Sequence, residues 1–213
     1  ASDEEIFKYW EGLGYYQRAA NLREACITII DQYNAQIPNT KEGLLKLKGI
    51  GDYTASAIAS IAFGAPHPAI DGNLKRIISR LLCLPDSKKK SLNKIESFLI
   101  KEINHKRAGD FNQALMDLGR TICKPKLPKC DSCPISIFCL SFKNKTTHLF
   151  PIKKSIKKII PHYNIGVGVI WHNDKILITK RKKNQLLGGL WEFPGGKIEN
   201  NESVSHCITR EAK

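Results

Sequence analysis

The stretch that decides the fold is LKGIGDYTA, residues 47–55. The helix predicted over Asp52–Phe63 begins inside it. Gly49 and Gly51 allow positive φ and carry no side chain, so backbone N–H groups there can face an anion beside the N-terminus of that helix. Ile50, between the glycines, is expected to enter the core. The sequence therefore predicts a phosphate-binding hairpin between two helices, with an ordinary tight turn as the alternative.

The surrounding sequence predicts a mainly α-helical region over residues 1–122, because apolar residues recur at helical spacing. Ser2 with Glu5 has the capping-box pattern of a first short helix, and Asn39 with Glu42 has the same pattern further on. Other helices are predicted after Gly14 and over Asp71–Leu84, Lys89–Ile103 and Phe111–Ile122.

An aspartate follows the hairpin region in the segment PAIDGN, residues 68–73. Asp71 has the position of a helix N-cap. A carboxylate that faces a sugar can also stabilise the positive charge that develops when a glycosidic bond breaks. Asn73 is then the residue to orient the carboxylate, and Lys75 the residue to approach a phosphate. The residues by themselves favour the cap and leave the catalytic role as the alternative.

Four of the seven cysteines fall in one short segment, with the spacing Cys123-x6-Cys130-x2-Cys133-x5-Cys139. Four thiolates in such a loop can surround one metal centre, and unliganded buried cysteines are the minor alternative. The spacing by itself leaves a zinc site and a [4Fe–4S] cluster equally open. The odd number of cysteines and the acidic N-terminus, which is unlike a signal peptide, favour a reducing cytoplasm.

The formal net charge of +14 favours a polyanionic partner, either nucleic acid or an anionic membrane surface. No stretch approaches the roughly 18 consecutive apolar residues of a membrane span. The sequence therefore predicts no membrane span among these residues, and the charge leaves a nucleic-acid-binding protein and an ordinary basic protein as alternatives.

The last third of the chain has a different pattern. Residues 141–161 contain several lysines and no acidic residue, which predicts an exposed basic linker. Alternating residues over 165–171 and 175–180, separated by a turn, predict strands, and a helix is predicted to begin at Ser203. We therefore expect a second, α+β domain over residues 162–213.

Together these features resemble the helix–hairpin–helix DNA glycosylase superfamily and, within it, the MutY family of adenine glycosylases. The resemblance covers nearly the whole chain and includes the cysteine spacing. It rests on WEGLGYYQR (residues 10–18), GIGDYTA (49–55), DGN (71–73) and FNQALMDLG (111–119). The segment LWEFPGGKIE (190–199) and the beginning of a Nudix box at Gly196-x5-Glu202-x7-Arg210-Glu211 resemble a Nudix domain.

The resemblance implies a mainly α fold: a helical glycosylase domain over 1–122, an iron–sulfur loop over 123–140, the basic linker, and a truncated Nudix-like domain over 162–213. It implies hydrolysis of the N-glycosidic bond of adenine mispaired with 8-oxoguanine or guanine in double-stranded DNA. The catalytic residues that it implies are Asp71, Asn73 and Tyr53. The DNA-binding residues are Tyr15, Gly49, Gly51 and Lys75. The ligands of a [4Fe–4S] cluster are Cys123, Cys130, Cys133 and Cys139.

Tyr53 distinguishes this chain from the endonuclease III branch, which has a nucleophilic lysine after its hairpin. A phenol cannot form the Schiff base of an efficient lyase, so a monofunctional glycosylase is expected. Three alternatives stay open: an endonuclease III-like glycosylase and lyase, a Nudix nucleotide hydrolase, and a non-catalytic DNA-binding module in which Asp71 is only a cap.

The resemblance also places two parts of the family's site outside these residues. A glutamate that protonates adenine is expected before residue 1, and the loop that contacts 8-oxoguanine is expected after Lys213. We therefore expect residues 1–213 by themselves to be inactive. A monomeric protein of the cytoplasm, working at the bacterial nucleoid, is expected.

Overall fold

A computed structural model describes residues 1–84, 89–152, 161–182, 185 and 187–212. The chain forms two compact units, Ala1–Ser155 and Ile156–Lys213. Part of the expected basic linker, residues 153–160, lies outside the described residues. Unit 1 includes the first part of that segment, residues 141–152.

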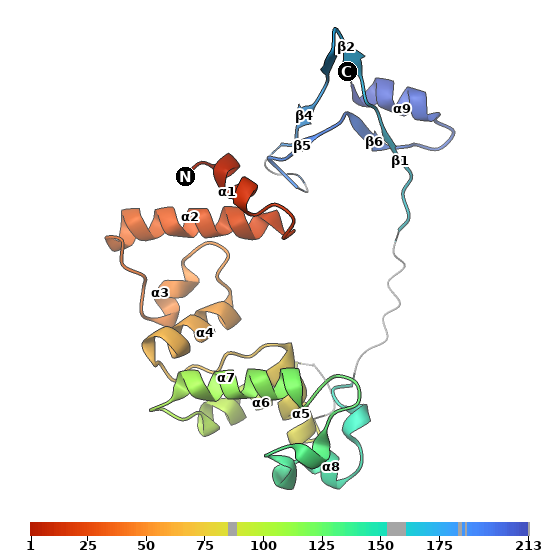
Figure 1. The fold of residues 1–213 in the computed structure, drawn as a ribbon. Coiled ribbons are helices and arrows are strands. Elements are labelled where there is room, and N and C mark those ends of the chain that lie inside the picture. The colour runs from red at the N-terminus through yellow and green to blue at the C-terminus, as the bar shows by residue number, and fades with distance from the viewer. Residues whose placement is uncertain (85–88, 153–160, 183–184, 186, 213) are drawn as a thin grey trace. The chain divides into compact units, whose positions relative to one another are not determined.

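Unit 1 is helical in its described part (Figure 1). Its α-helices are α1 (Asp3–Tyr9), α2 (Tyr16–Tyr33), α3 (Lys41–Leu45), α4 (Asp52–Phe63), α5 (Gly72–Leu81), α6 (Lys89–Glu102), α7 (Ala108–Thr121) and α8 (Leu140–Lys143). Its 3-10 helices are Cys130–Ser132, Ser136–Phe138 and Thr147–Leu149. The mainly α fold that the sequence predicts for this region is confirmed.

The helix ends follow the capping residues of the sequence. Ser2 and Glu5 form the expected capping box at α1. At α3 the N-cap is Thr40, whose side chain accepts a hydrogen bond from the N–H of Gly43. The prediction of Asn39 as this cap was wrong by one residue, because a threonine hydroxyl at the next position serves the same purpose.

Two apolar clusters hold unit 1 together. The first joins α2, α3 and α4 and contains Leu44 and Leu47, with Ile50 of the hairpin packed against it as expected. The second joins α5, α6 and α7 around the fully buried Leu74 and Leu99. Each buried leucine contributes about 1.5–3 kcal/mol to stability.

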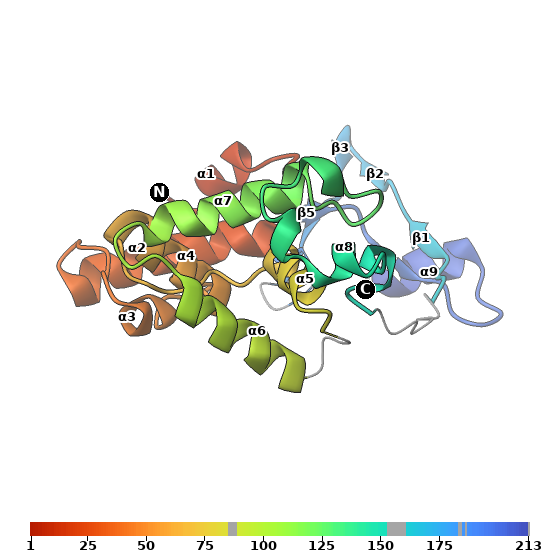
Figure 2. The same cartoon turned by 90° about the horizontal axis from the view of Figure 1, so that it is seen from below.

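Helix α7 connects these two clusters, because it packs against both α4 and α5. Figure 2 shows α6 and α7 diverging from the turn that joins them. Helix α8, which follows the last cysteine of the loop, packs against α5. Helix α5, whose N-cap is Asp71, is thus held between the helical core and the segment that follows the cysteine loop.

Unit 2 contains three two-stranded antiparallel pairs and one helix. The pairs are β1 (Ile165–Val167) with β6 (Gly195–Lys197), β2 (Trp171–His172) with β3 (Lys175–Ile176), and β4 (Thr179–Lys180) with β5 (Trp191–Glu192). The helix is α9 (Val204–Glu211), with Ser203 as the N-cap that its position predicts. The turn between β2 and β3 has positive φ at Asn173 and Asp174, as a tight hairpin requires.

The glycines of the predicted alternation face α9. A Cβ atom at Gly168 would lie 2.5 Å from Cγ2 of Ile208, so only glycine permits this contact. The alternating apolar residues Ile165 and Val167 are more than half exposed in the described part of unit 2. None of the described helices is long and apolar enough to cross a membrane.

Candidate functional site

The glycine hairpin lies between α3 and α4 and packs against α2. Gly49 has φ of +78°, and a Cβ atom there would lie 2.7 Å from Cβ of Asn21. Gly49 is therefore required by both its backbone conformation and its packing. Gly51 differs from the expectation: its φ is −93°, so it needs no positive-φ conformation.

Gly51 nevertheless leaves open space at the start of α4. No described atom lies within 4 Å of the position that its Cβ would take, and no side chain caps the helix. The free N–H groups of a helix N-terminus favour an anion there. Asp52, at the same end, forms an ion pair with Lys41 at 2.7 Å, which offsets its negative charge.

The two tyrosines singled out in the sequence are both accessible. Tyr53 lies in the first turn of α4 and is 41% exposed, while Tyr15 is 82% exposed and precedes α2. Trp10 supports the loop of Tyr15, because its indole N–H donates to the carbonyl of Gly14 at 2.9 Å. Among the described residues no hydrogen bond joins Tyr53 to Asp71.

Asp71 is both the N-cap of α5 and the centre of a hydrogen-bonded pair. Its Oδ1 accepts from the N–H of Leu74 at 2.7 Å, which is the capping bond. Its Oδ2 accepts from Nδ2 of Asn73 at 2.8 Å, as the sequence predicts. Asp71 and Asn73 are only partly buried, so the fixed carboxylate stays accessible. Capping and an additional chemical role are therefore compatible.

Arg76 continues this network into the cysteine loop. It is 8% exposed and donates to Oδ1 of Asn73, to the carbonyl of Gly119 and to the carbonyl of Cys123, each at 2.8 Å. Burial lowers the pKa of its guanidinium, although an arginine stays charged at neutral pH. Sequence reasoning did not identify this residue, whose signal is an arginine on the buried face of an amphipathic helix.

Two residues of α7 make room for the site and hold the segment before it. Gly119 allows α5 to approach closely, because a Cβ atom there would lie 2.7 Å from Cβ of Asn73. Asn112 is fully buried, accepts from the N–H of Ala69 and donates to the carbonyl of His67. The segment that leads to Asp71 is therefore fixed by an amide of another helix.

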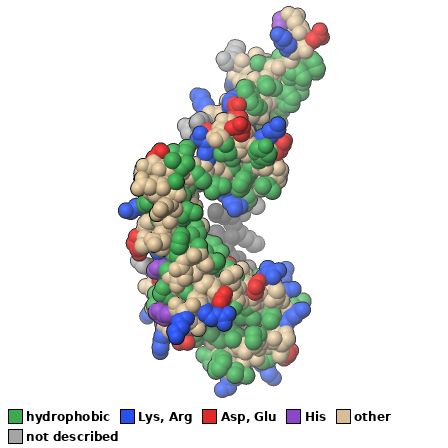
Figure 3. Space-filling view, turned by 60° about the vertical axis from the view of Figure 1, so that its left-hand side comes forward, with side chains coloured by type: hydrophobic (Ala, Val, Ile, Leu, Met, Phe, Trp, Pro, Cys, Tyr) green, Lys and Arg blue, Asp and Glu red, His purple; other side chains and the backbone are tan. Residues whose placement is uncertain are grey.

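Lys75 and the other basic residues form a more diffuse feature. Lys75 is partly exposed on α5, and no ion pair joins it to a described acidic residue. On the face shown in Figure 3, Lys and Arg side chains are spread over the surface and are not gathered in one patch. The site is thus defined by its fixed polar network more than by a local concentration of charge.

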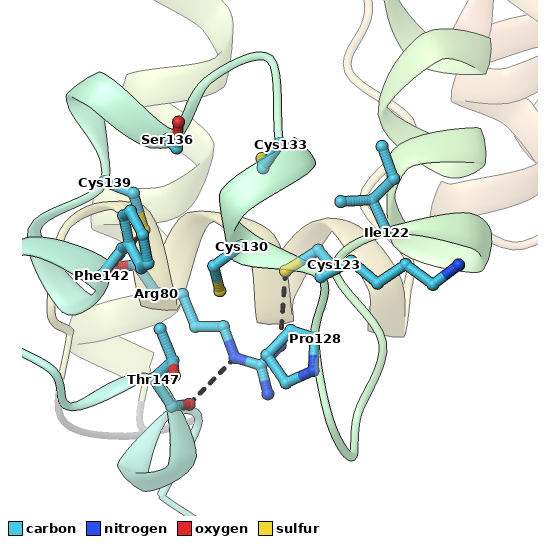
Figure 4. Close-up of a pocket in the computed structure, with 11 residues that line it drawn as sticks. Arg80, Ile122, Cys123, Pro128, Cys130, Cys133, Ser136, Cys139, Phe142 and Thr147 are labelled. Carbon is cyan, nitrogen blue, oxygen red and sulfur yellow. Dashed lines mark hydrogen bonds between the residues drawn. The ribbon is translucent and has the colours of Figure 1, made fainter.

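The four clustered cysteines line one pocket between α5 and the loop that follows α7. Figure 4 shows Cys123, Cys130, Cys133 and Cys139 around this pocket, with Arg80 reaching into it. In the described part of the chain no three His, Cys, Asp or Glu side chains converge closely enough to hold one metal ion. The pocket nevertheless collects the four cysteine side chains in one place.

Two thiols of this pocket, those of Cys130 and Cys139, are harder to ionise than an exposed cysteine. Burial raises the pKa of Cys130, the neighbouring cysteines raise it further, and the guanidinium of Arg80 lowers it. Burial also raises the pKa of Cys139, while hydrogen bonds from the backbone of residues 141 and 142 lower it. A cationic centre among the sulfurs would favour the thiolates instead.

Two protein families match the chain. The family described as HhH-GPD superfamily base excision DNA repair protein matches residues 1–101, and the NUDIX domain family matches residues 166–213. The first match contains the hairpin and Asp71, and the second covers most of unit 2.

Individual relatives match most of the chain. An adenine DNA glycosylase of Arabidopsis thaliana is 35% identical over 98% of the chain and 35% of its own length. An adenine DNA glycosylase of Buchnera aphidicola is 36% identical over 90% of the chain and 55% of its own length. The chain thus spans about a third to about half of these relatives.

Among solved structures, a non-covalent endonuclease III–DNA complex is similar, with a TM-score of 0.58 and 31% identity over 68% of the chain and 67% of the solved chain. A thermostable thymine-DNA glycosylase has a TM-score of 0.59 and 28% identity over 68% of the chain and 67% of the solved chain. Both matches extend well beyond the hairpin, because each covers 68% of the chain.

Proposed function

Because the chain belongs to the HhH-GPD superfamily of base excision DNA repair proteins, we propose that the protein is a monofunctional DNA glycosylase that removes adenine mispaired with 8-oxoguanine or guanine. Similarity to adenine DNA glycosylases over 90–98% of the chain supports the choice of base. The partner would be double-stranded DNA, bound by a monomer.

The observation that carries the catalytic proposal is the double use of the Asp71 carboxylate. One oxygen caps α5 and the other is held by Asn73, yet the group is only partly buried. Breaking the glycosidic bond develops positive charge on the sugar, and a carboxylate already fixed beside it stabilises that charge without reorganisation. Flipping the nucleotide out of the duplex would give the sugar access to Asp71.

The remaining catalytic steps need a water nucleophile and an acid. Tyr53 would line the site without forming a Schiff base, so water attacks the sugar. Adenine is a poor leaving group and must be protonated. We assign the protonation to the glutamate that the resemblance places before residue 1.

DNA binding would use the open start of α4. A backbone phosphate fits beside Gly51, where the N–H groups of the helix are uncapped, and Lys75 would contact a second phosphate. Tyr15 is exposed enough to enter the duplex beside the oxidised guanine. Of these contacts, only that of Tyr15 would depend on the bases.

We further propose that Cys123, Cys130, Cys133 and Cys139 hold a [4Fe–4S] cluster. The donor set fits, because four thiolates are the usual ligands of such a cluster. Zinc also takes four thiolates, and the choice of a cluster rests on the resemblance of the cysteine spacing to that of the glycosylase family. The four cysteines line a single pocket, as one four-thiolate cofactor requires. When bound, it cross-links the loop and supplies redox-active iron.

A single-turnover excision assay on an adenine:8-oxoguanine duplex tests the function in the full-length protein. Asp71→Asn keeps the capping oxygen and removes the charge, so excision should fall at least about 100-fold while mismatch binding is retained. The control is Asp110→Asn, which removes an exposed carboxylate paired with Arg107 and should cleave at the parent rate.

Two results would contradict the proposal. Excision by Asp71→Asn at the parent rate would leave Asp71 as a helix cap only. A covalent protein–DNA adduct after borohydride reduction would reveal a Schiff base and favour the lyase instead.

A further inference from the structure

Arg80 is a buried arginine whose contacts converge on the cysteine pocket. It lies on α5, one turn after Arg76, and is 3% exposed. Its guanidinium donates to the carbonyls of Thr147 (3.1 Å), Phe150 (3.0 Å), Lys124 (2.7 Å) and Pro125 (3.1 Å) and to Sγ of Cys123 (3.3 Å). The side chain therefore connects the start of the cysteine loop, the segment that follows α8 and one of the cysteine sulfurs.

The charge of Arg80 is not balanced by any carboxylate of the residues that the structure describes. Within the described residues, no Asp or Glu oxygen forms an ion pair with Arg80, and its partners are neutral carbonyls and one thiol. An arginine does not give up its proton in a protein. A buried charge without a counter-charge is costly, even when its hydrogen bonds are satisfied. The arrangement therefore points to an anion in the pocket that Arg80 lines.

We propose that Arg80 is the counter-charge of the iron–sulfur cluster and raises its reduction potential. The inference rests on the cluster proposed above. The loaded site is an anion, because four thiolate charges outweigh the charge of the iron–sulfur core. A cation that also donates a hydrogen bond to Cys123 Sγ stabilises the more reduced, more negative form, and both effects act on the potential.

The experiment compares three variants of the full-length protein. Arg80→Gln keeps a hydrogen-bonding side chain and removes the charge, while Arg80→Lys keeps the charge. Arg120→Gln is the matched control, because it removes a positive charge from an exposed side chain paired with Asp117. Iron content and visible absorbance are measured first, and the midpoint potential of the one-electron couple is then measured by spectroelectrochemistry.

We expect Arg80→Gln to lower the equilibrium constant for one-electron reduction at least tenfold, which corresponds to about 59 mV. The midpoint potential of Arg80→Lys should be closer to that of the parent than to that of Arg80→Gln, and the midpoint potential of Arg120→Gln should equal that of the parent. An Arg80→Gln protein with full iron content and the parent potential would overturn the inference.

Other outcomes are equally decisive. If Arg80→Gln does not retain the cluster, Arg80→Lys decides the matter. Full iron content with less than a tenfold change in the equilibrium constant for reduction supports a role of charge. A tenfold or larger fall in that constant overturns it. A parent protein that contains no iron would instead refute the cluster itself. The failure of the cofactor proposal is thus distinguished from the failure of the role of Arg80.

Discussion

Replacing Arg76 by methionine should destabilise unit 1 and slow excision together. Methionine is close to arginine in length but donates no hydrogen bond. The substitution leaves three acceptors without their arginine partner: Oδ1 of Asn73 and the carbonyls of Gly119 and Cys123. A buried polar group left unpaired costs about 1–3 kcal/mol.

The total follows from the burial of these acceptors. Two of the acceptors, Oδ1 of Asn73 and the carbonyl of Cys123, are only partly buried, so water can replace part of their loss, and we take the lower end of the range as a minimum for each of the three. The expected loss is about 3 kcal/mol. For a protein of this size 1 kcal/mol lowers the melting temperature by about 2–4 °C, so we expect a fall of about 6–12 °C.

Differential scanning fluorimetry of the full-length protein measures this change, and single-turnover kinetics measure excision. The excision rate should also fall, because Asn73 loses the bond that orients its amide toward Asp71. Arg120→Met, at an exposed site, is the control and should change the melting temperature by no more than about 2 °C. If Arg76→Met melts within that limit as well, the network contributes no net stability and the reasoning is wrong.

Three other changes test separate parts of the molecule. Gly51→Val should weaken binding to matched and mismatched DNA alike without lowering the melting temperature. Gly49→Val should lower the melting temperature, because Gly49 has positive φ and lies against α2. Equal DNA affinity of the parent and Gly51→Val in filter binding would contradict the phosphate site. Elemental analysis of anaerobically purified protein should find iron that Cys130→Ser reduces, and stoichiometric zinc without iron would rule the cluster out. A hydrogen bond from the Arg210 side chain lowers the pKa of Glu202 to about 2. The carboxylate therefore stabilises unit 2 fully at pH values above its unfolded pKa of about 4.3, and this stabilisation disappears as the pH falls toward 2. Glu202→Gln should therefore lower the melting temperature near neutral pH, and melting curves at decreasing pH should converge with the parent; a constant difference would contradict the assignment.

The helices and their ends could be predicted from the sequence because local chemistry decides them. Ser2 and Ser203 begin helices because their hydroxyls accept hydrogen bonds from the first turn, and Gly64 ends α4 because it adopts positive φ. The hydrogen bond between Asp71 and Asn73 could also be predicted from the sequence, because a side-chain amide two residues after an N-cap lies close to the capping carboxylate.

Contacts between distant segments could not be predicted in this way. Asn112 bonds residues 43–52 positions earlier in the chain, and Arg76 reaches a carbonyl 47 positions later. Nothing in the local pattern around these residues fixes such partners, because they depend on how α5 and α7 pack. The conformation of Gly51 was also missed, since a glycine that provides space has the same sequence signal as one that provides a positive φ.

Helix α5 carries Arg76 and Arg80 one turn apart, and both reach backbone carbonyls at the start of the cysteine loop. The amide hydrogens of α5 and those of Cys123 and Lys124 should therefore exchange with solvent in a single cooperative opening, although more than forty residues separate them in sequence. Exchange protection lost at the start of the loop would then be lost in the helix that Asp71 caps as well.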